Sequence, residues 1–132
     1  MQRSAHKKRK GAAIVEFAIV VPLILLIVVA VVNINALIYL KQSAKIACYE
    51  GCRVGIVRGA TTENVQAQVM EILNGRRVRD YSIEIVPNDV ATMAAGDHLT
   101  VRVQVNPSSN LFFDGWFANN SMSTEVAMRC EL

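Results

Sequence analysis

The sequence predicts an α+β protein in which a single long N-terminal transmembrane helix continues into a small extracytoplasmic domain of helix and antiparallel sheet. Three observations lead to this prediction. A long stretch near the N-terminus is almost wholly apolar, basic residues crowd in front of it, and apolar residues alternate with polar ones in the last third of the chain. These features place a membrane anchor first and a water-facing domain after it.

The apolar stretch is long enough to cross a membrane. No side chain in residues 17–32 is polar or charged, and residues 12–15 extend the stretch with Glu16 as the one interruption. About 20 apolar residues, at about 1.5 Å each, span a hydrocarbon core of about 30 Å. A secretory signal has an apolar region of only about 7–15 residues and a small-residue cleavage site, which the following residues do not provide. We therefore predict a membrane span at residues 12–35.

Residues 1–11 form a basic leader. They contain five of the 14 Lys and Arg residues, whereas all 11 Asp and Glu residues follow them, so the rest of the chain has a net charge of −2. A basic cluster beside a span marks the cytoplasmic side. We expect a cytoplasmic N-terminus and an extracytoplasmic domain at residues 36–132. Because the positive charge belongs to the leader, the sequence does not predict a nucleic-acid-binding domain.

The helix is predicted to continue beyond the span to Arg58, with Gly59 as its stop. Apolar and small residues recur there at spacings of three and four, which defines one narrow stripe. From Ala44 onward the stripe consists mostly of small residues, so that another element can approach the backbone closely. The residues of the stripe are Leu37, Leu40, Ala44, Ala47, Gly51 and Val54.

A second helix and three strands are predicted in the remainder. The helix starts with Thr61 or Thr62 as its cap and ends at Gly75. Alternating apolar residues predict strands at residues 81–87, 99–105 and 121–130. The loop before the last strand is rich in aromatic residues, which we expect in the core; an adhesive or subunit-contact patch is the alternative. These residues are Phe112, Phe113, Trp116 and Phe117.

Glu16 needs a reason, because a carboxylate in a membrane segment costs about 2.5–3.5 kcal/mol and is functional by default. A cut after Gly11 would provide one. Ala12 would then carry a positive amine four residues before Glu16, on the same helical face, where the helix dipole also favours a carboxylate. The alternative is that Glu16 only marks the edge of the span, in the head-group zone.

The basic leader, Gly11 before the proposed cut and a glutamate at the fifth position after it resemble type IV prepilins and pseudopilins. Glu16-Phe17, followed by Pro22, is more specifically similar to the TadE-like proteins of tight-adherence (Flp-type) pilus systems. The stretch Ala47-Cys48-Tyr49-Glu50-Gly51-Cys52-Arg53 resembles the pattern Ala-x-x-Glu-Gly-x-Arg that follows the span in that family. The strong part of the resemblance covers residues 7–59. The chain departs from the family at Cys48 and Cys52, where other small residues are usual.

The resemblance implies a pilin-like fold and a pseudopilin or minor pilin that takes part in the assembly of adhesive pili at the bacterial inner membrane. A prepilin peptidase would cut between Gly11 and Ala12, and Glu16, flanked by Phe17, would serve assembly. Other pilins or pseudopilins and the pilus secretion machinery would be its partners. The protein would have no catalytic activity, cofactor or small-molecule substrate. The alternatives are an uncleaved, signal-anchored binding or scaffold module of the envelope and a membrane-tethered hydrolase, for which no nucleophile–base pair is visible.

Cys48, Cys52 and Cys130 leave an odd thiol if one pair is oxidised. A disulfide is permitted outside the cytoplasm. Cys48 and Cys52 are four residues apart on the predicted helix, an awkward geometry for a bond. We favour Cys52–Cys130, with Cys48–Cys130 and three reduced thiols as alternatives. No metal site is predicted, because the only histidines are His98 and His6, and His6 lies in the leader.

Glu50 and Arg53 are three residues apart on the predicted helix. We expect a solvated ion pair worth a few tenths of a kcal/mol. A role of this pair in docking the domain is the alternative.

Overall fold

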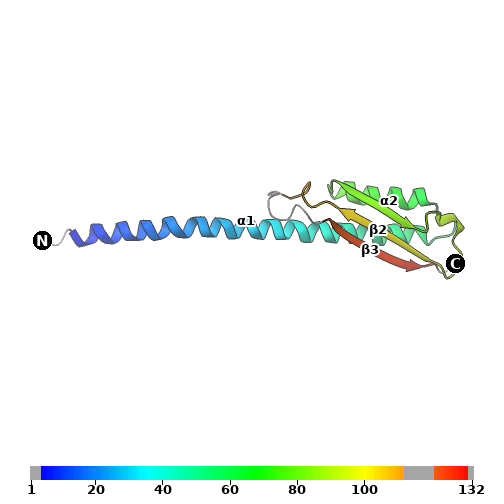
Figure 1. Cartoon of the computed structure of the whole chain (residues 1–132), viewed down its shortest axis with the longest axis horizontal. Helices are drawn as coiled ribbons and strands as arrows, with labels where there is room; N and C mark the ends of the chain where they lie inside the picture. Colours follow the sequence, from blue (N-terminus) through cyan, green and yellow to red (C-terminus); the bar gives the residue numbers. More distant parts are fainter. Residues whose placement is uncertain (1–3, 112–120, 131–132) are drawn as a thin grey trace. The chain divides into compact units, whose positions relative to one another are not determined.

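The computed structural model describes residues 4–111 and 121–130. The chain divides into two units, residues 1–35 and residues 36–132. Its elements are labelled in Figure 1 where space permits: α1 (Ser4–Gly55), α2 (Thr62–Gly75), β1 (Tyr81–Val86), the short 3-10 helix η1 (Val90–Thr92), β2 (His98–Val105) and β3 (Met122–Arg129). The aromatic group predicted at residues 112–117 lies outside the described residues.

The first unit contains the N-terminal part of α1. In the described part of the chain, α1 is the one helix whose length and composition would allow it to cross a membrane. Its large apolar side chains are exposed; Phe17, for example, has 70% of its surface accessible. An apolar helix that covers no protein core needs another apolar environment, and a bilayer provides it. Residues 12–35 are therefore a candidate single-pass anchor, as predicted.

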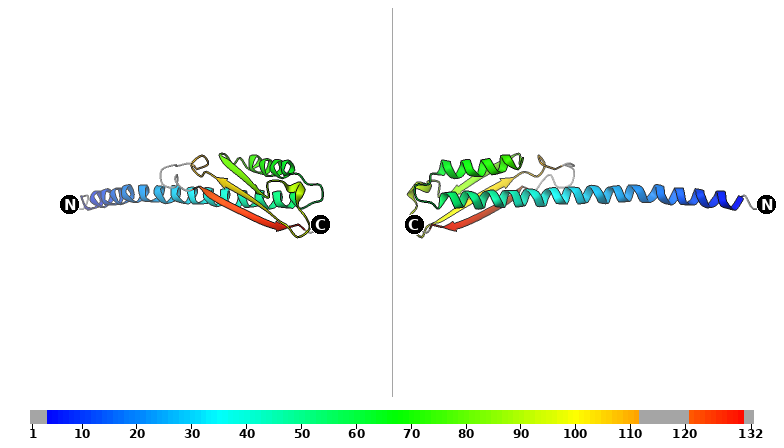
Figure 2. Two further views of the ribbon diagram at one scale, coloured as in Figure 1. Left: turned by 45° about the vertical axis from the view of Figure 1, so that its right-hand side comes forward. Right: turned by 180° about the vertical axis from the view of Figure 1, so that it is seen from behind.

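The second unit is an α+β domain, which confirms the predicted fold class. Its sheet has the strand order β1-β2-β3 with both pairs antiparallel, so that Val103 lies opposite Ile83 on one side and Thr124 on the other. The last turns of α1 and the whole of α2 lie along one face of this sheet, as Figures 1 and 2 show from three directions. The strands therefore bury one face and leave the other open to water.

The core lies between the two helices and the covered face of the sheet. Alternate residues of β2 are fully or almost fully buried, while Arg102 and Gln104 between them point to the open face. This is the period-two pattern that predicted the strand. The helices contribute small residues from α1 and aliphatic residues from α2. Buried in the core are Leu40, Ala44, Ala47, Cys48, Cys52, Val65, Val69, Leu73, Leu99, Val101, Val103 and Val105.

The helix ends follow local signals with one correction. The Thr61 side chain caps α2 by accepting a hydrogen bond from the backbone N–H of Asn64 at 3.3 Å, and α2 ends at Gly75, both as predicted. Helix α1 ends at Gly55 rather than at Arg58, so that prediction was wrong by three residues. The chain turns over the next residues and reaches Gly59, whose φ of +80° suits glycine.

Candidate functional site

The predicted processing segment lies within α1. Ala12 and Glu16 are four residues apart in a continuous helix, so both lie on one helical face. The side chains of residues 11–17 are exposed. A Cβ atom added at Gly11 would meet no atom within 4 Å. Packing in the described structure therefore gives no reason for glycine at this position.

Gly51 is in the opposite situation, because it lies where α1 and α2 cross. A Cβ atom at Gly51 would lie 2.5 Å from Cγ2 of Val69 and 3.6 Å from Cγ1 of Val65. Real Cβ atoms do not approach other atoms as closely as the first of these distances, so the absence of a side chain lets the helices meet. The predicted close approach of another element to the small-residue stripe is confirmed, and that element is α2.

One turn later, Gly55 plays the same role at the end of α1. A Cβ atom there would overlap Leu99 of β2 and lie 2.9 Å from Cγ2 of Val65. Glycines at both positions therefore seat the end of α1 between α2 and the sheet. The helix motif Glu50–Gly51–Arg53 is thus built around a residue with a packing function.

Glu50 and Arg53 form the expected ion pair beside this crossing. The Arg53 Nη1 atom lies 3.4 Å from Oε2 of Glu50, and the side chains are 70% and 34% exposed, respectively. The contact is long and solvated, so it contributes little to stability. The Glu50 side chain lies partly against the protein, while most of the Arg53 side chain is exposed to solvent.

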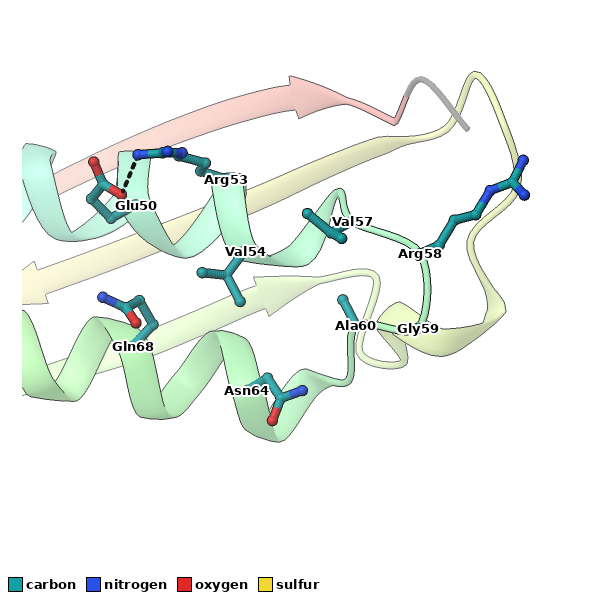
Figure 3. Close-up of a pocket in the computed structure, with 9 residues that line it drawn as sticks. All are labelled: Glu50, Arg53, Val54, Val57, Arg58, Gly59, Ala60, Asn64 and Gln68. Carbon is teal, nitrogen blue, oxygen red and sulfur yellow. Dashed lines mark hydrogen bonds and ion pairs between the residues drawn. The ribbon is translucent and has the colours of Figure 1, made fainter.

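The pair stands at the edge of a groove of about 480 Å³ between the end of α1 and the first half of α2. Figure 3 shows Val54 and Gln68 between the two helices and Asn64 at the first turn of α2, whereas the Arg58 side chain points away from them. The groove is lined by Glu50, Arg53, Val54, Val57, Arg58, Gly59, Ala60, Asn64 and Gln68. Its apolar floor and charged edge are suited to contact with another polypeptide surface.

Asn64 and Gln68 were not singled out from the sequence. Each directly precedes a buried valine of α2, Val65 and Val69. The sequence did show that both residues lie beside the buried face of an amphipathic helix. It did not show which helix packs against that face. Within residues 4–111 and 121–130, no group of three or more His, Cys, Asp or Glu side chains comes together as a metal site.

The three cysteines are buried as free thiols, so the predicted Cys52–Cys130 disulfide, and the alternative Cys48–Cys130, are not confirmed. Each thiol faces a different backbone carbonyl. Cys48 donates to Thr124 at 3.4 Å and Cys52 to Val126 at 3.2 Å, while Cys130 donates to Ile56 at 3.6 Å. Successive turns of α1 thus place Cys48 and Cys52 beside Thr124 and Val126 of β3, and Cys130, the residue after β3, lies beside Ile56, the residue after α1.

Burial also makes two of the thiols poor nucleophiles. Removal from water raises the pKa of the Cys48 thiol from 9.0 to about 11, and it raises the pKa of Cys52 as well. Since the thiolate is the reactive form, both side chains behave as small apolar residues at neutral pH.

These features define first a class of protein: a chain with one candidate N-terminal membrane helix whose last turns are packed into a small α+β domain. Comparison with known protein families finds a similarity over part of the chain. Residues 11–53 match the model of the TadE-like protein family, as the resemblance predicted. The matched segment begins at Gly11 and ends at Arg53, which is about a third of the chain. No curated protein and no solved structure matches the chain.

Proposed function

We propose that this protein is a pseudopilin that takes part in the assembly of adhesive Flp-type pili and is cut after Gly11 by a prepilin peptidase. It would be anchored in the bacterial inner membrane by residues 12–35, with its N-terminus in the cytoplasm and its domain outside. It would act through contacts with other pilins and the secretion machinery, without catalysis or a cofactor. The observation that carries the proposal is the TadE-like match over residues 11–53.

The surroundings of Gly11 support the proposed cut. Glycine costs about 1 kcal/mol relative to alanine within a helix, and nothing packs against Gly11 that would require it. The requirement for glycine at position 11 would then come from outside the chain. The active site of a peptidase that accepts an extended backbone with no side chain would supply it.

Glu16 would become useful once the leader is removed. The new amine of Ala12 lies four residues before Glu16, so the two groups share a face of α1 and can neutralise each other. The amine of a neighbouring subunit could do the same in lipid, where an unpaired charge is costly. A carboxylate at this depth would then favour the insertion of one subunit beside another.

The N-terminus of the protein isolated from membranes tests the cut. We expect the sequence to start at Ala12. Gly11→Arg should leave the leader attached, because a long charged side chain does not fit a site built for glycine, whereas the matched variant Gly11→Ala, which adds only a methyl group, should be cut more slowly than the wild-type protein. An intact leader on the wild-type protein would instead support the uncleaved envelope module.

Glu16→Ala tests the membrane carboxylate. Removing the charge should leave insertion intact or improve it, while the amount of assembled pili falls. The matched control is Glu71→Ala, which removes an exposed carboxylate from α2. Unchanged piliation in the Glu16 variant would show that Glu16 only marks the edge of the span.

A further inference from the structure

The loop after α2 concentrates positive charge in the second unit. Residues 76–80 have the sequence Arg-Arg-Val-Arg-Asp, which gives three positive charges against one negative charge. Arg77 and Arg79 are exposed, and Arg76 is half-buried. In the part of the chain that the structure describes, none of these arginines forms an ion pair, since the recorded pairs involve only Arg53 and Arg102. Their charges are available to an external anion.

The loop is held in place by the segment that follows β2. The Asn110 side chain accepts a hydrogen bond from the backbone N–H of Arg79 at 2.8 Å and donates one to the Arg79 carbonyl at 2.7 Å. The Asp80 carboxylate accepts hydrogen bonds from Asn106 at 2.9 Å and Ser109 at 3.0 Å. The one acidic group of the loop is therefore engaged with neutral donors and is not paired with the arginines.

The two segments enclose a shallow polar groove. It has a volume of about 260 Å³ and is lined by Arg77, Arg79, Ser109, Asn110 and Leu111. Guanidinium groups bind phosphate through two parallel hydrogen bonds, and Arg77 and Arg79 are the two guanidinium groups that line this groove. A phosphate group is thus the ligand that best fits the charge and the donors of this groove.

Tyr39 connects the loop to the part of α1 that follows the predicted span. Its hydroxyl group donates a hydrogen bond to the backbone carbonyl of Arg76 at 3.3 Å. Tyr39 follows the end of the predicted span, Asn35, by four residues, and four helical residues rise about 6 Å. Tyrosine is also enriched where a chain leaves the hydrocarbon core. The arginine loop therefore contacts α1 only four residues after the end of the predicted span.

We propose that the arginines of residues 76–80, in the loop that Ser109 and Asn110 hold in place, bind the phosphate-bearing head groups of anionic phospholipids on the outer surface of the membrane that anchors the chain. The inference rests on the anchoring by residues 12–35 but on neither the cut after Gly11 nor pilus assembly. Each arginine near an anionic surface strengthens binding by about fivefold. Such contacts would keep this end of the domain on the membrane until the subunit is withdrawn from it.

Hydrogen exchange of the full chain in lipid nanodiscs tests the proposal. One set of discs contains phosphatidylcholine alone, and in the other part of it is replaced by phosphatidylglycerol. We expect exchange at residues 77–80 to be slowed by about fivefold or more in the anionic discs. Arg77→Gln/Arg79→Gln should abolish this difference, and Arg77→Lys/Arg79→Lys should retain part of it, because the charge remains while the planar donor pair is lost.

The matched control is Arg58→Gln/Arg129→Gln, which removes the same charge after the far end of α1 and at the end of β3. It should keep the protection. Equal exchange in both kinds of disc, or an equal loss in the control variant, would overturn the proposal. The same protection on adding inorganic phosphate to phosphatidylcholine discs would also overturn it, since a free anion would then be the ligand. A chain that separates from the discs would show instead that the anchor fails.

Discussion

Residues 12–35 and residues 36–55 belong to the same helix, but they differ in side-chain size and in burial. The first stretch consists mostly of large aliphatic residues, and most of these are exposed; Leu26, for example, is 69% exposed. The second carries small residues on one face, where Ala47 and Cys52 are fully buried, and polar residues such as Lys41 and Lys45 on the other.

The difference shows how two apolar environments select different residues. A bilayer accepts any large apolar side chain around the whole circumference of a helix, because lipid tails adapt to its surface. A protein core has a fixed shape, so the residues of α1 that face α2 and the sheet must be small enough for close approach. The same backbone thus serves as a candidate anchor and as part of a folded domain.

The largest effect that separates the two stretches is expected from a leucine-to-alanine change in each. Leu40 is 4% exposed, and Leu40→Ala should lower the free energy of unfolding of the domain by about 2–5 kcal/mol through lost burial and a cavity. Leu26→Ala, in the apolar stretch, should leave it unchanged. Hydrogen exchange of the β2 amides of the full chain in micelles measures both. Equal losses of stability in the two variants would contradict the division of α1 into an exposed stretch at residues 12–35 and a buried one at residues 36–55.

A titratable group in the buried part of α1 predicts a pH dependence. The folded-state pKa of Cys48 is about 11, above its ordinary value of 9.0, so the folded protein holds a proton that the unfolded chain loses first. The stabilisation is complete below pH 9 and falls by about 2 kcal/mol as the pH approaches 11. Other groups also titrate between pH 9 and 11. The quantity to measure is therefore the slope of the free energy of unfolding against pH, compared between the wild-type protein and Cys48→Ala. Identical slopes would contradict the buried position of the thiol.

The helix crossing gives a smaller effect. Gly51→Ala should lower the free energy of unfolding by about 1–2 kcal/mol, because the steric conflict with Val69 exceeds the gain in helix propensity. Gly75→Ala, at the end of α2, meets no atom within 4 Å and should be neutral or stabilising. Urea unfolding of the two variants compares them. A stabilised Gly51 variant would mean that the helices can separate without cost.

The smallest effect is expected on the open face of the sheet. Arg102 there lies 2.9 Å from Glu84 and 2.7 Å from Glu125, which links all three strands. These pairs are exposed, so Arg102→Gln should change the free energy of unfolding by no measurable amount in the same urea experiment. A loss as large as that of Gly51→Ala would show that the open face contributes to stability as the covered face does.

Local patterns in the sequence were sufficient for most of the elements. The apolar stretch, the Thr61 cap, the stop at Gly75 and the alternation around Val101 each depend on neighbours in the sequence. The end of α1 was predicted three residues too late, because contacts with Leu99 and the turn at Gly59, rather than helix propensity, decide where it ends.

The candidate site could be predicted only in part. The motif Glu50–Gly51–Arg53 was found from its resemblance to a family, and its ion pair from the spacing of three. Its groove was not found, because Asn64 and Gln68 reach it through the packing of a second helix. The run of arginines after α2 is visible in the sequence, but only the structure shows that the Tyr39 side chain contacts it.

The sequence by itself determined the candidate anchor, the order of helices and strands and the segment that matches the TadE-like family, because hydrophobic periodicity and local capping act over a few residues. Only the tertiary structure decided why packing requires glycine at position 51 and not at position 11, why three thiols face three separate carbonyls, and which loop lies beside Tyr39. Each of these depends on groups far apart in the chain, and their distances are set by the packing of α1, α2 and the sheet around one core.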